Sequence, residues 1–304
     1  MVRVRARGGA VAAIGNFDGV HRGHQQLLQK TVEFARKLQG FPAALVFEPH
    51  PRRYFRPDDP PFLLTSPARR DALLRAHGAE EVITLQFDAG LASMTPEAFV
   101  HDILKTKLDL SGVVAGTEFR FGKERAGDAQ SLKTLAAAAG VETLLARPAP
   151  AAAPGGKVGS SAIRAALRDG DVRAAAEMLG RPWSVEGEVV AGQRLGRTLG
   201  FPTANMALGA LIEPRRGVYA VEAAFGGAIL PGVANFGRKP TVGAPAALLE
   251  TYIFDFDGDL YGRTIDVALI DFIRDERKFD GLEALKAQIG ADCEAARHLL
   301  AHRR

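Results

Sequence analysis

The hydrophobic pattern changes character once along the chain, near Pro182, and this change constrains the fold more than any other feature. Before Pro182, short apolar runs alternate with amphipathic stretches, which is typical of βαβ units and a parallel sheet. After Pro182, strand-like runs follow one another with Gly-rich turns between them, which indicates an antiparallel barrel. The sequence therefore predicts an α/β domain over residues 1–182 and a β-barrel domain over residues 183–304.

The expected elements of the first domain follow from this alternation. We expect strands at 11–14, 43–47, 81–85, 112–115 and 141–146, and helices at 21–39, 68–77, 96–107, 129–139, 160–168 and 171–179. Thr95 and Pro96 supply a capping candidate and a proline in the first turn, which is a helix start signal. An Ala/Pro/Gly-rich stretch at 148–157 is expected to be a loop.

The second domain is expected to be built from strands and one helix. We expect strands at 184–191, 217–224, 229–236, 248–256 and 264–273, followed by a C-terminal helix at 281–300. Each strand is short, and the spacing between strands suits hairpin connections.

Composition narrows the class of protein. The net charge is +4 and charged residues make up 24% of the chain, with basic residues dispersed among acidic ones, which argues against a nucleic-acid-binding surface. No apolar run approaches the ~20 residues that a membrane helix needs. Cys293 is the single cysteine, so an intrachain disulfide is excluded. We expect a cytoplasmic protein with no nucleic-acid or membrane partner, and a homo-oligomer is compatible with the sequence.

The first motif, GNFDGVHRGH at residues 15–24, lies between an expected strand and an expected helix. Helix N-termini at the carboxyl ends of parallel strands present N–H groups that suit phosphate. His21 and His24 share one face of the first helical turn, and Gly19 and Gly23 allow a ligand close to the backbone. From these residues alone, surface histidines in a Gly-rich turn, or a zinc site with His50, are alternatives.

This string resembles the HxGH signature of the nucleotidyltransferase superfamily. Its longer form is similar to the adenylyltransferase module of bacterial bifunctional riboflavin kinase/FAD synthetases. Further blocks resemble that family in the same order: FEPHP at 47–51, FRFG at 119–122 with GD at 127–128, and SSAIR at 160–164. Gly159, Ser161 and Glu118 depart from the residues usual in the family.

The resemblance implies a Rossmann-like domain that transfers the adenylyl group of ATP to FMN. His21, His24 and Arg164 would supply hydrogen-bond donors to the developing charge. The ATP and phosphate site would comprise Gly15, Phe17, Asp18, Gly19, His21, His24, Ser160, Ser161 and Arg164. The flavin site would comprise His50, Pro51, Phe55, Glu118 and Phe121, although core packing is the alternative for both phenylalanines.

The second motif, GRTLGFPTAN at residues 196–205, resembles a block of riboflavin kinases. Extended backbone would put Thr203 and Asn205 on one face, and their oxygens suit Mg²⁺. By composition alone, the stretch is equally a turn. The blocks NFGRKPT at 235–241 and ETYIFDF at 250–256 resemble the same family, with Lys239 and Tyr252 as departures. Asp255, Asp257 and Asp259 lack the spacing of a calcium loop.

The second resemblance implies a six-stranded kinase barrel with a C-terminal helix. Its ATP site would comprise Gly196, Arg197, Gly200, Phe201, Pro202, Thr203 and Asn205, with Mg²⁺ held by Thr203 and Asn205. Glu250 would be the general base, and an exposed strand carboxylate is the alternative. Together the two resemblances imply an enzyme that makes FMN from riboflavin and ATP, and FAD from FMN and ATP. One working module beside an inactive one is the alternative.

Overall fold

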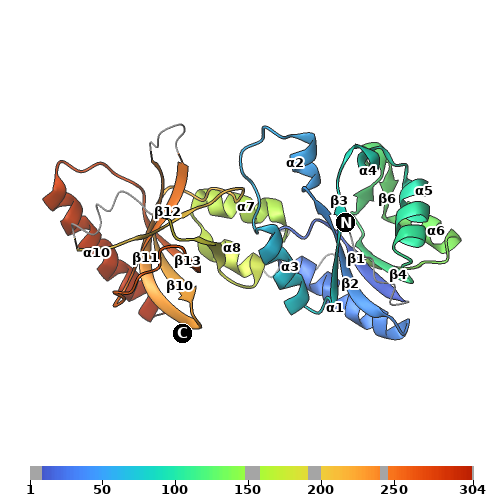
Figure 1. Ribbon diagram of the computed structural model, residues 1–304, viewed down its shortest axis with the longest axis horizontal. Coiled ribbons are helices and arrows are strands. Elements are labelled where there is room, and N and C mark those ends of the chain that lie inside the picture. Colours follow the sequence, from blue (N-terminus) through green and yellow to red (C-terminus); the bar gives the residue numbers. More distant parts are fainter. Residues whose placement is uncertain (1–8, 148–157, 191–199, 240–245, 303–304) are drawn as a thin grey trace. The chain divides into compact units, whose positions relative to one another are not determined.

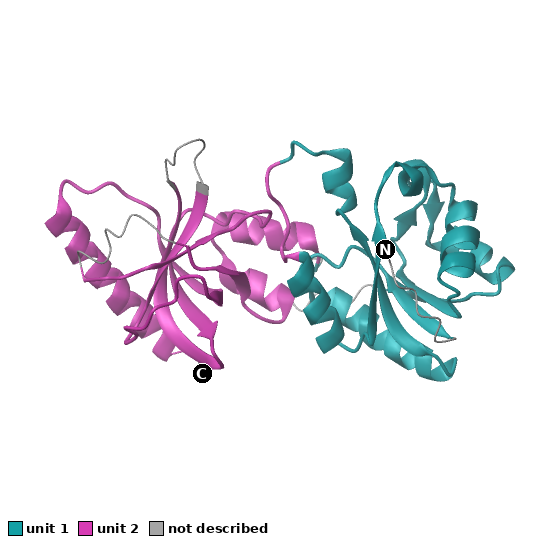
Figure 2. Ribbon diagram, viewed as in Figure 1, with its two compact units in different colours: residues 1–59, 67–158 teal, residues 60–66, 159–304 magenta. Residues whose placement is uncertain are grey.

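The structure is a computed structural model that describes residues 9–147, 158–190, 200–239 and 246–302 (Figure 1). The chain divides into two compact units (Figure 2): unit 1 is residues 1–59 and 67–158, and unit 2 is residues 60–66 and 159–304. Among the described residues, no helix has the length and apolar character that crossing a membrane requires.

Unit 1 is built on a parallel sheet with the strand order β3-β2-β1-β4-β7. Its strands are β1 (Ala10–Ile14), β2 (Phe41–Glu48), β3 (Glu81–Gln86), β4 (Gly112–Gly116) and β7 (Glu142–Ala146). Every residue of β1 is buried, because β1 lies centrally and both of its faces are covered. This confirms the expected α/β Rossmann-like fold. The strand order runs from β1 outward in both directions, with β2 on one side and β4 on the other. Parallel sheets of this kind bind ligands at the carboxyl ends of the two strands where the direction changes, here β1 and β4.

The helices of unit 1 connect these strands. They are α1 (Arg22–Lys37), α2 (Pro51–Phe55), α3 (Pro67–Ala76), α4 (Ala89–Ser93), α5 (Pro96–Ala98) and α6 (Ala129–Ala138). The helix expected at 96–107 does start at Pro96, and the Thr95 hydroxyl accepts a hydrogen bond from the Ala98 amide at 3.2 Å. It widens at once into a π-helical segment, η1 (Phe99–Lys107). A short hairpin of β5 (Arg120–Phe121) and β6 (Gly127–Asp128), with the 3₁₀ turn η2 (Lys123–Arg125), completes unit 1.

Unit 2 contains the expected antiparallel barrel, with strand order β8-β13-β10-β11-β12-β9. Its strands are β8 (Trp183–Glu188), β9 (Ala204–Ala207), β10 (Gly217–Phe225), β11 (Ala228–Lys239), β12 (Ala246–Ile253) and β13 (Thr264–Arg274). The Val190 amide, just after β8, donates to the Asn205 carbonyl of β9 at 2.9 Å. This bond joins the two edge strands of the sheet and nearly closes the barrel. Helix α10 (Leu282–Ala301) packs outside against β10 and β11, where Cys293 and Ala296 meet Val218 and Val233.

Two helices that precede the strand-only region pack with the barrel. These are α7 (Ser160–Asp169) and α8 (Val172–Leu179), and their apolar residues Ile163, Leu167 and Leu179 join the core formed by β8 and its neighbours. The boundary expected between residues 182 and 183 is where the hydrophobic pattern of the sequence changes. The boundary between the two compact units lies earlier, between residues 158 and 159, just before α7. Residues 60–66 also belong to unit 2, where Leu63 pairs with Leu211.

Candidate active sites

The HxGH residues lie where β1 passes into α1. His21 is the N-cap of α1, and its Nδ1 accepts a hydrogen bond from the His24 amide at 3.3 Å. The His21 and His24 rings stack with their centres 3.6 Å apart and their planes 16° from parallel. A Cβ on Gly23 would lie 3.2 Å from the His21 ring, so the glycine makes room for this pair. The structure therefore brings the two expected histidines into direct contact.

The environment of His24 controls its charge. Burial, and then the neighbouring His21, hold the pKa of His24 well below its ordinary value of 6.5, so His24 is neutral near pH 7. Within the described part of the chain, its buried Nδ1 has no hydrogen-bond partner. A neutral imidazole still offers one N–H donor, which suits a phosphoryl oxygen.

Phe17 anchors the loop that carries the histidines. Its side chain is fully buried, and its ring centre lies 5.0 Å from that of His24. Phe17 has φ +53° and Val20 has φ +41°, a left-handed conformation that non-glycine residues rarely adopt. Gly19 joins them at φ +84°, and Asp18 is buried beside it. A strained loop at the head of a helix is a frequent feature of functional sites.

The expected flavin residues of unit 1 differ in exposure. His50 caps α2, and its Nδ1 accepts a hydrogen bond from the Arg52 amide at 3.0 Å. Phe55 is 63% exposed and lies edge-on to Phe87, with ring centres 5.7 Å apart. Phe121, by contrast, is only 7% exposed and packs in the core of unit 1.

The remaining expected positions there are Pro51, in the first turn of α2, and Glu118, which is exposed in the loop after β4. The structure gives no support to the zinc alternative: among the described residues, no group of three or more His, Cys, Asp or Glu side chains could hold a metal ion.

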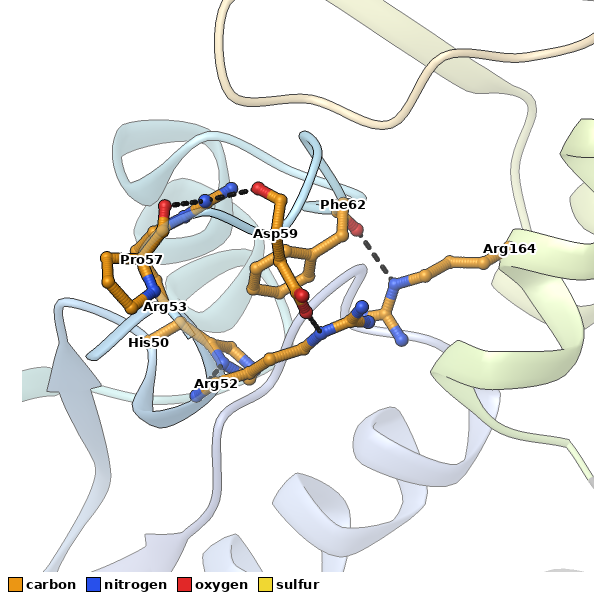
Figure 3. Close-up of polar contacts among 7 residues, drawn as sticks. All are labelled: His50, Arg52, Arg53, Pro57, Asp59, Phe62 and Arg164. Atoms are coloured by element: carbon orange, nitrogen blue, oxygen red, sulfur yellow. Dashed lines mark hydrogen bonds and ion pairs between the residues drawn. The ribbon is translucent and has the colours of Figure 1, made fainter. Parts of the chain in front are cut away.

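The loop after α2 is held by two arginines of that helix (Figure 3). Arg52 Nε donates to the Asp59 carboxylate at 2.8 Å. Arg53 Nη1 donates to the carbonyls of Pro57 and Asp59, at 2.8 and 2.5 Å. These bonds give the loop a defined path up to Asp59, the last residue before the segment 60–66.

The SSAIR block lies on α7 and so belongs to unit 2. Ser160 and Ser161 open the helix after Gly159, which provides no side-chain cap. Arg164 is 8% exposed, and its Nε donates to the Phe62 carbonyl at 2.8 Å (Figure 3). The HxGH loop lies in unit 1, so the expected phosphate-binding set is divided between the two units.

A cavity of about 620 Å³ opens in the barrel of unit 2 at the TAN segment. Gly200, Pro202, Thr203 and Asn205 line it, whereas Phe201 packs edge-on against Tyr252 with ring centres 5.4 Å apart. The lining of the cavity also includes Thr251, Tyr252 and the loop residues from Phe256 to Tyr261. Gly196 and Arg197 fall outside the described residues.

Asn205 lines this cavity and has a buried side-chain oxygen. The residue is 4% exposed, its Nδ2 donates to the Thr203 carbonyl at 3.2 Å, and its buried Oδ1 has no hydrogen-bond partner among the described residues. The buried Thr251 hydroxyl is unpartnered in the same part of the structure. A buried carbonyl oxygen without a donor costs free energy unless a ligand satisfies it. Hard oxygen atoms of this kind fit Mg²⁺.

Glu250 lies in a polar row across three strands. Register places it on β12 between Asn235 of β11 and Asn205 of β9, and residues directly opposite in a sheet share one face. The cavity lining includes Asn205 and Tyr252 but not Glu250, which is half-buried. Asn235 and Thr251 are not among the candidate site residues that the sequence predicts. Their positions beside Glu250 and Asn205 follow from the strand register, which the sequence does not show.

Comparisons with known proteins assign a family to each of the two regions that contain these sites. Family models match residues 4–162, described as FAD synthetase, and residues 179–300, described as riboflavin kinase. A protein of Escherichia coli described as bifunctional riboflavin kinase/FMN adenylyltransferase is 40% identical over 95% of this chain and 92% of its own length. This chain belongs to that family. The riboflavin kinase/FMN adenylyltransferase of Pseudomonas fluorescens is 42% identical over 96% of this chain and 94% of its own.

A solved structure extends the likeness to the three-dimensional fold. It is described as a macrolide-efflux protein from Streptococcus pneumoniae, is 33% identical, and superposes with a TM-score of 0.87 over 97% of this chain and 96% of its own. As a riboflavin kinase/FMN adenylyltransferase family member, the chain carries both an FAD synthetase domain and a riboflavin kinase domain, as its motifs predict.

Proposed function

We propose that the chain phosphorylates riboflavin with ATP to give FMN, and adenylylates FMN with a second ATP to give FAD and pyrophosphate. The observation that carries the proposal is that each family domain contains polar groups suited to its reaction: the stacked His21 and His24 in one, and the cavity-lining Asn205 with its buried oxygen in the other. A cytoplasmic location belongs to the same proposal, supported by a chain with one cysteine.

In the adenylyl transfer, an FMN phosphate oxygen attacks the α-phosphorus of ATP, and the bond to the leaving pyrophosphate breaks. The attacking oxygen carries no proton that must be removed, so catalysis depends on positioning and on donors aimed at the developing charge. His21, His24 and Arg164 would supply these donors. Gly15, Phe17, Asp18 and Gly19, with Ser160 and Ser161, would form the rest of the ATP site.

The flavin of this reaction would lie against α2. Phe55 supports this assignment because it is a large exposed aromatic side chain whose ring lies beside that of Phe87. His50 and Pro51 lie at the start of the same helix, which Phe55 ends, and Glu118 is exposed in the loop after β4. Phe121 would act from the core, by holding the hairpin of β5 and β6 in place.

In the kinase reaction, the 5′-hydroxyl of riboflavin attacks the γ-phosphorus of ATP and gives up its proton. Glu250 is the proposed acceptor of that proton. Thr203 and Asn205 would hold Mg²⁺, which neutralises charge on the polyphosphate. Gly196, Arg197, Gly200, Phe201 and Pro202 would form the loop that binds ATP.

The proposal is tested by incubating the purified protein with riboflavin, ATP and MgCl₂ and separating the flavins by chromatography. FMN and then FAD are the expected products, and pyrophosphate release should accompany FAD. A parallel incubation with FMN in place of riboflavin reports the second reaction alone. FMN without FAD in the first incubation, together with no FAD from supplied FMN in the second, would mean that only the kinase works. Absence of FMN and FAD from the first incubation and of FAD from the second would overturn the proposal.

A further inference from the structure

Arg297, on α10, contacts two consecutive residues that follow β12. Its Nη1 and Nη2 donate to the two carboxylate oxygens of Asp255, at 3.0 and 3.1 Å. Its guanidinium carbon also lies 4.2 Å from the centre of the Phe254 ring, within cation–π range. Exposed ion pairs usually contribute little to stability. This one is bidentate and is combined with a ring contact, so both the position and the plane of the guanidinium group are fixed.

Asp255 has a backbone conformation that residues other than glycine rarely adopt. Its φ is +55°, in the left-handed region, and the chain turns here after β12 ends at Ile253. Such a conformation persists only where surrounding contacts hold it. Arg297 provides such contacts: its hydrogen bonds hold the pKa of the Asp255 carboxyl below the ordinary value of 3.8, so the pair is charged at neutral pH. The side chain of Arg297 therefore stabilises the turn.

The residues that follow this turn form part of the cavity wall in unit 2. The loop from Phe256 to Tyr261 lines that cavity together with the TAN segment. Backbone hydrogen bonds hold the far end of the loop: the Gly262 amide donates to the Val189 carbonyl at 3.0 Å, and the Val189 amide donates to the Arg263 carbonyl at 2.9 Å. At the near end, the path of the loop depends on the turn at Asp255.

The loop faces the proposed nucleotide site rather than the proposed proton acceptor. The cavity that it lines also contains Thr203 and Asn205, the candidate groups for Mg²⁺ and ATP, whereas Glu250 is not in the lining. A displaced loop would therefore change the shape of the ATP-binding cavity and leave the acceptor in place.

We propose that Arg297 is a positioning residue for riboflavin phosphorylation: by holding the turn at Asp255, it keeps residues 256–261 where they complete the cavity that binds ATP. The inference rests on the proposed function, in which this cavity binds ATP. Arg297 itself is not in the cavity lining, so it acts through the loop and not on the substrate.

The test compares Arg297→Met, Asp255→Asn and the double variant in the full chain. Methionine keeps an apolar stem but removes the charge and the planar group. Asparagine tolerates a positive φ about as well as aspartate but removes the carboxylate. Arg297→Lys is the conservative variant, since lysine keeps the charge and lacks the two-pronged donor.

Arg215 offers a matched control on the same unit. It also makes a bidentate pair, with Asp275 at 2.8 and 2.7 Å, and its guanidinium carbon also lies over an aromatic ring, 4.7 Å from the centre of Phe272. Neither of these partners lines the cavity. Arg215→Met therefore removes the same kind of contacts without touching the loop from 256 to 261.

The readouts are kcat and the KM for ATP in FMN formation from riboflavin. A smaller fraction of folded protein lowers the apparent kcat and leaves KM unchanged, so the split between the two constants separates positioning from mere stability. FAD formation from supplied FMN, by the same preparations, is the internal control.

We expect Arg297→Met to raise the kinase KM for ATP about three- to tenfold, the combined range of an exposed ion pair and an exposed cation–π contact. The kinase kcat should change less than about twofold, because the proton acceptor stays in place. Arg297→Lys should lie between wild type and Arg297→Met, and Arg215→Met should keep the wild-type KM. The double variant should exceed the larger single effect by less than about twofold, since residues in contact are not additive. FAD formation should be unchanged throughout.

An unchanged kinase KM in Arg297→Met would overturn the inference. So would a lower kcat with an unchanged KM, which would leave Arg297 a stabilising role only. An equal rise of KM in Arg215→Met would show that the effect is not specific to the loop. Full multiplication of the two single effects would show that Arg297 acts independently of Asp255. A wild-type protein that forms no FMN from riboflavin would instead refute the proposed function itself.

Discussion

Helices α7 and α8 should be required for the barrel to fold. We expect a fragment of residues 159–304 to unfold cooperatively in urea, and a fragment of residues 182–304, which lacks both helices, not to do so. The reason is that α7 and α8 supply part of the barrel core rather than covering its outside. This comparison decides between a boundary at 182/183, where the sequence pattern changes, and one ahead of α7.

The size of the effect follows from the side chains removed. Ile163, Leu167, Val172 and Leu179 are each 0–1% exposed and belong to the core that contains Trp183. Full burial of such a side chain contributes about 1.5–3 kcal/mol, so these residues together contribute roughly 6–12 kcal/mol. Domains are stable by only about 5–15 kcal/mol in total. Loss of both helices therefore removes most or all of the stability.

The assay uses a natural probe. Trp183 is the single tryptophan of the chain and is 2% exposed, so its fluorescence reports on this core alone. Both fragments lack residues 60–66, so the difference between them isolates α7 and α8. A cooperative transition of the 182–304 fragment at the same urea midpoint as the 159–304 fragment would refute the reasoning.

Further expectations concern single residues. Glu250→Gln should lower the initial rate of FMN formation about 100- to 10,000-fold, the usual contribution of a general base, and leave FAD formation from FMN unchanged; a loss under about tenfold would leave Glu250 a structural role. His24→Gln should slow FAD formation from FMN about 100- to 1000-fold with the kinase rate intact, and equal rates would remove His24 from the chemistry. Because the folded-state pKa of His24 lies below its unfolded value near 6.5, its contribution to stability is complete above pH 6.5 and declines at lower pH; the urea midpoint should therefore fall more between pH 7 and 5 in wild type than in His24→Gln. Burial, and then Asp292, raise the pKa of Cys293 to about 11, so at pH 8 its thiol should react with a disulfide reagent far more slowly in the native protein than in urea, and similar rates would contradict this.

The sequence predicted the layers of the fold better than their details. The alternation of apolar runs was sufficient for the parallel sheet, because β1 and β2 are buried on both faces and contain almost no polar residues. The π-helical segment η1 was not predicted, because its apolar period differs little from that of an α-helix over nine residues. The short hairpin of β5 and β6 gave no usable period either, since each strand has only two residues.

For the sites, local motifs were informative and long-range placement was not. The spacing of His21 and His24 predicted that they share a face, and the structure stacks them. Nothing in the sequence indicated that Phe62 reaches Arg164, because the two residues are 102 positions apart and no local period records such a contact. The burial of Phe121 was likewise open, since an aromatic next to a glycine suits both a core and a ligand site.

The attachment of residues 60–66 to unit 2 has a consequence for the order of events during synthesis. Leu63 leaves the ribosome long before Ala210 and Ile212, the residues whose backbone groups it bonds. At about 5–20 residues per second, some 150 residues of translation separate the two events by roughly 7–30 s. During that interval Phe62, Leu63 and Leu64 are an apolar stretch without its barrel. A nascent chain that halts before residue 210 would carry this stretch exposed, and it is the point at which a chaperone should bind.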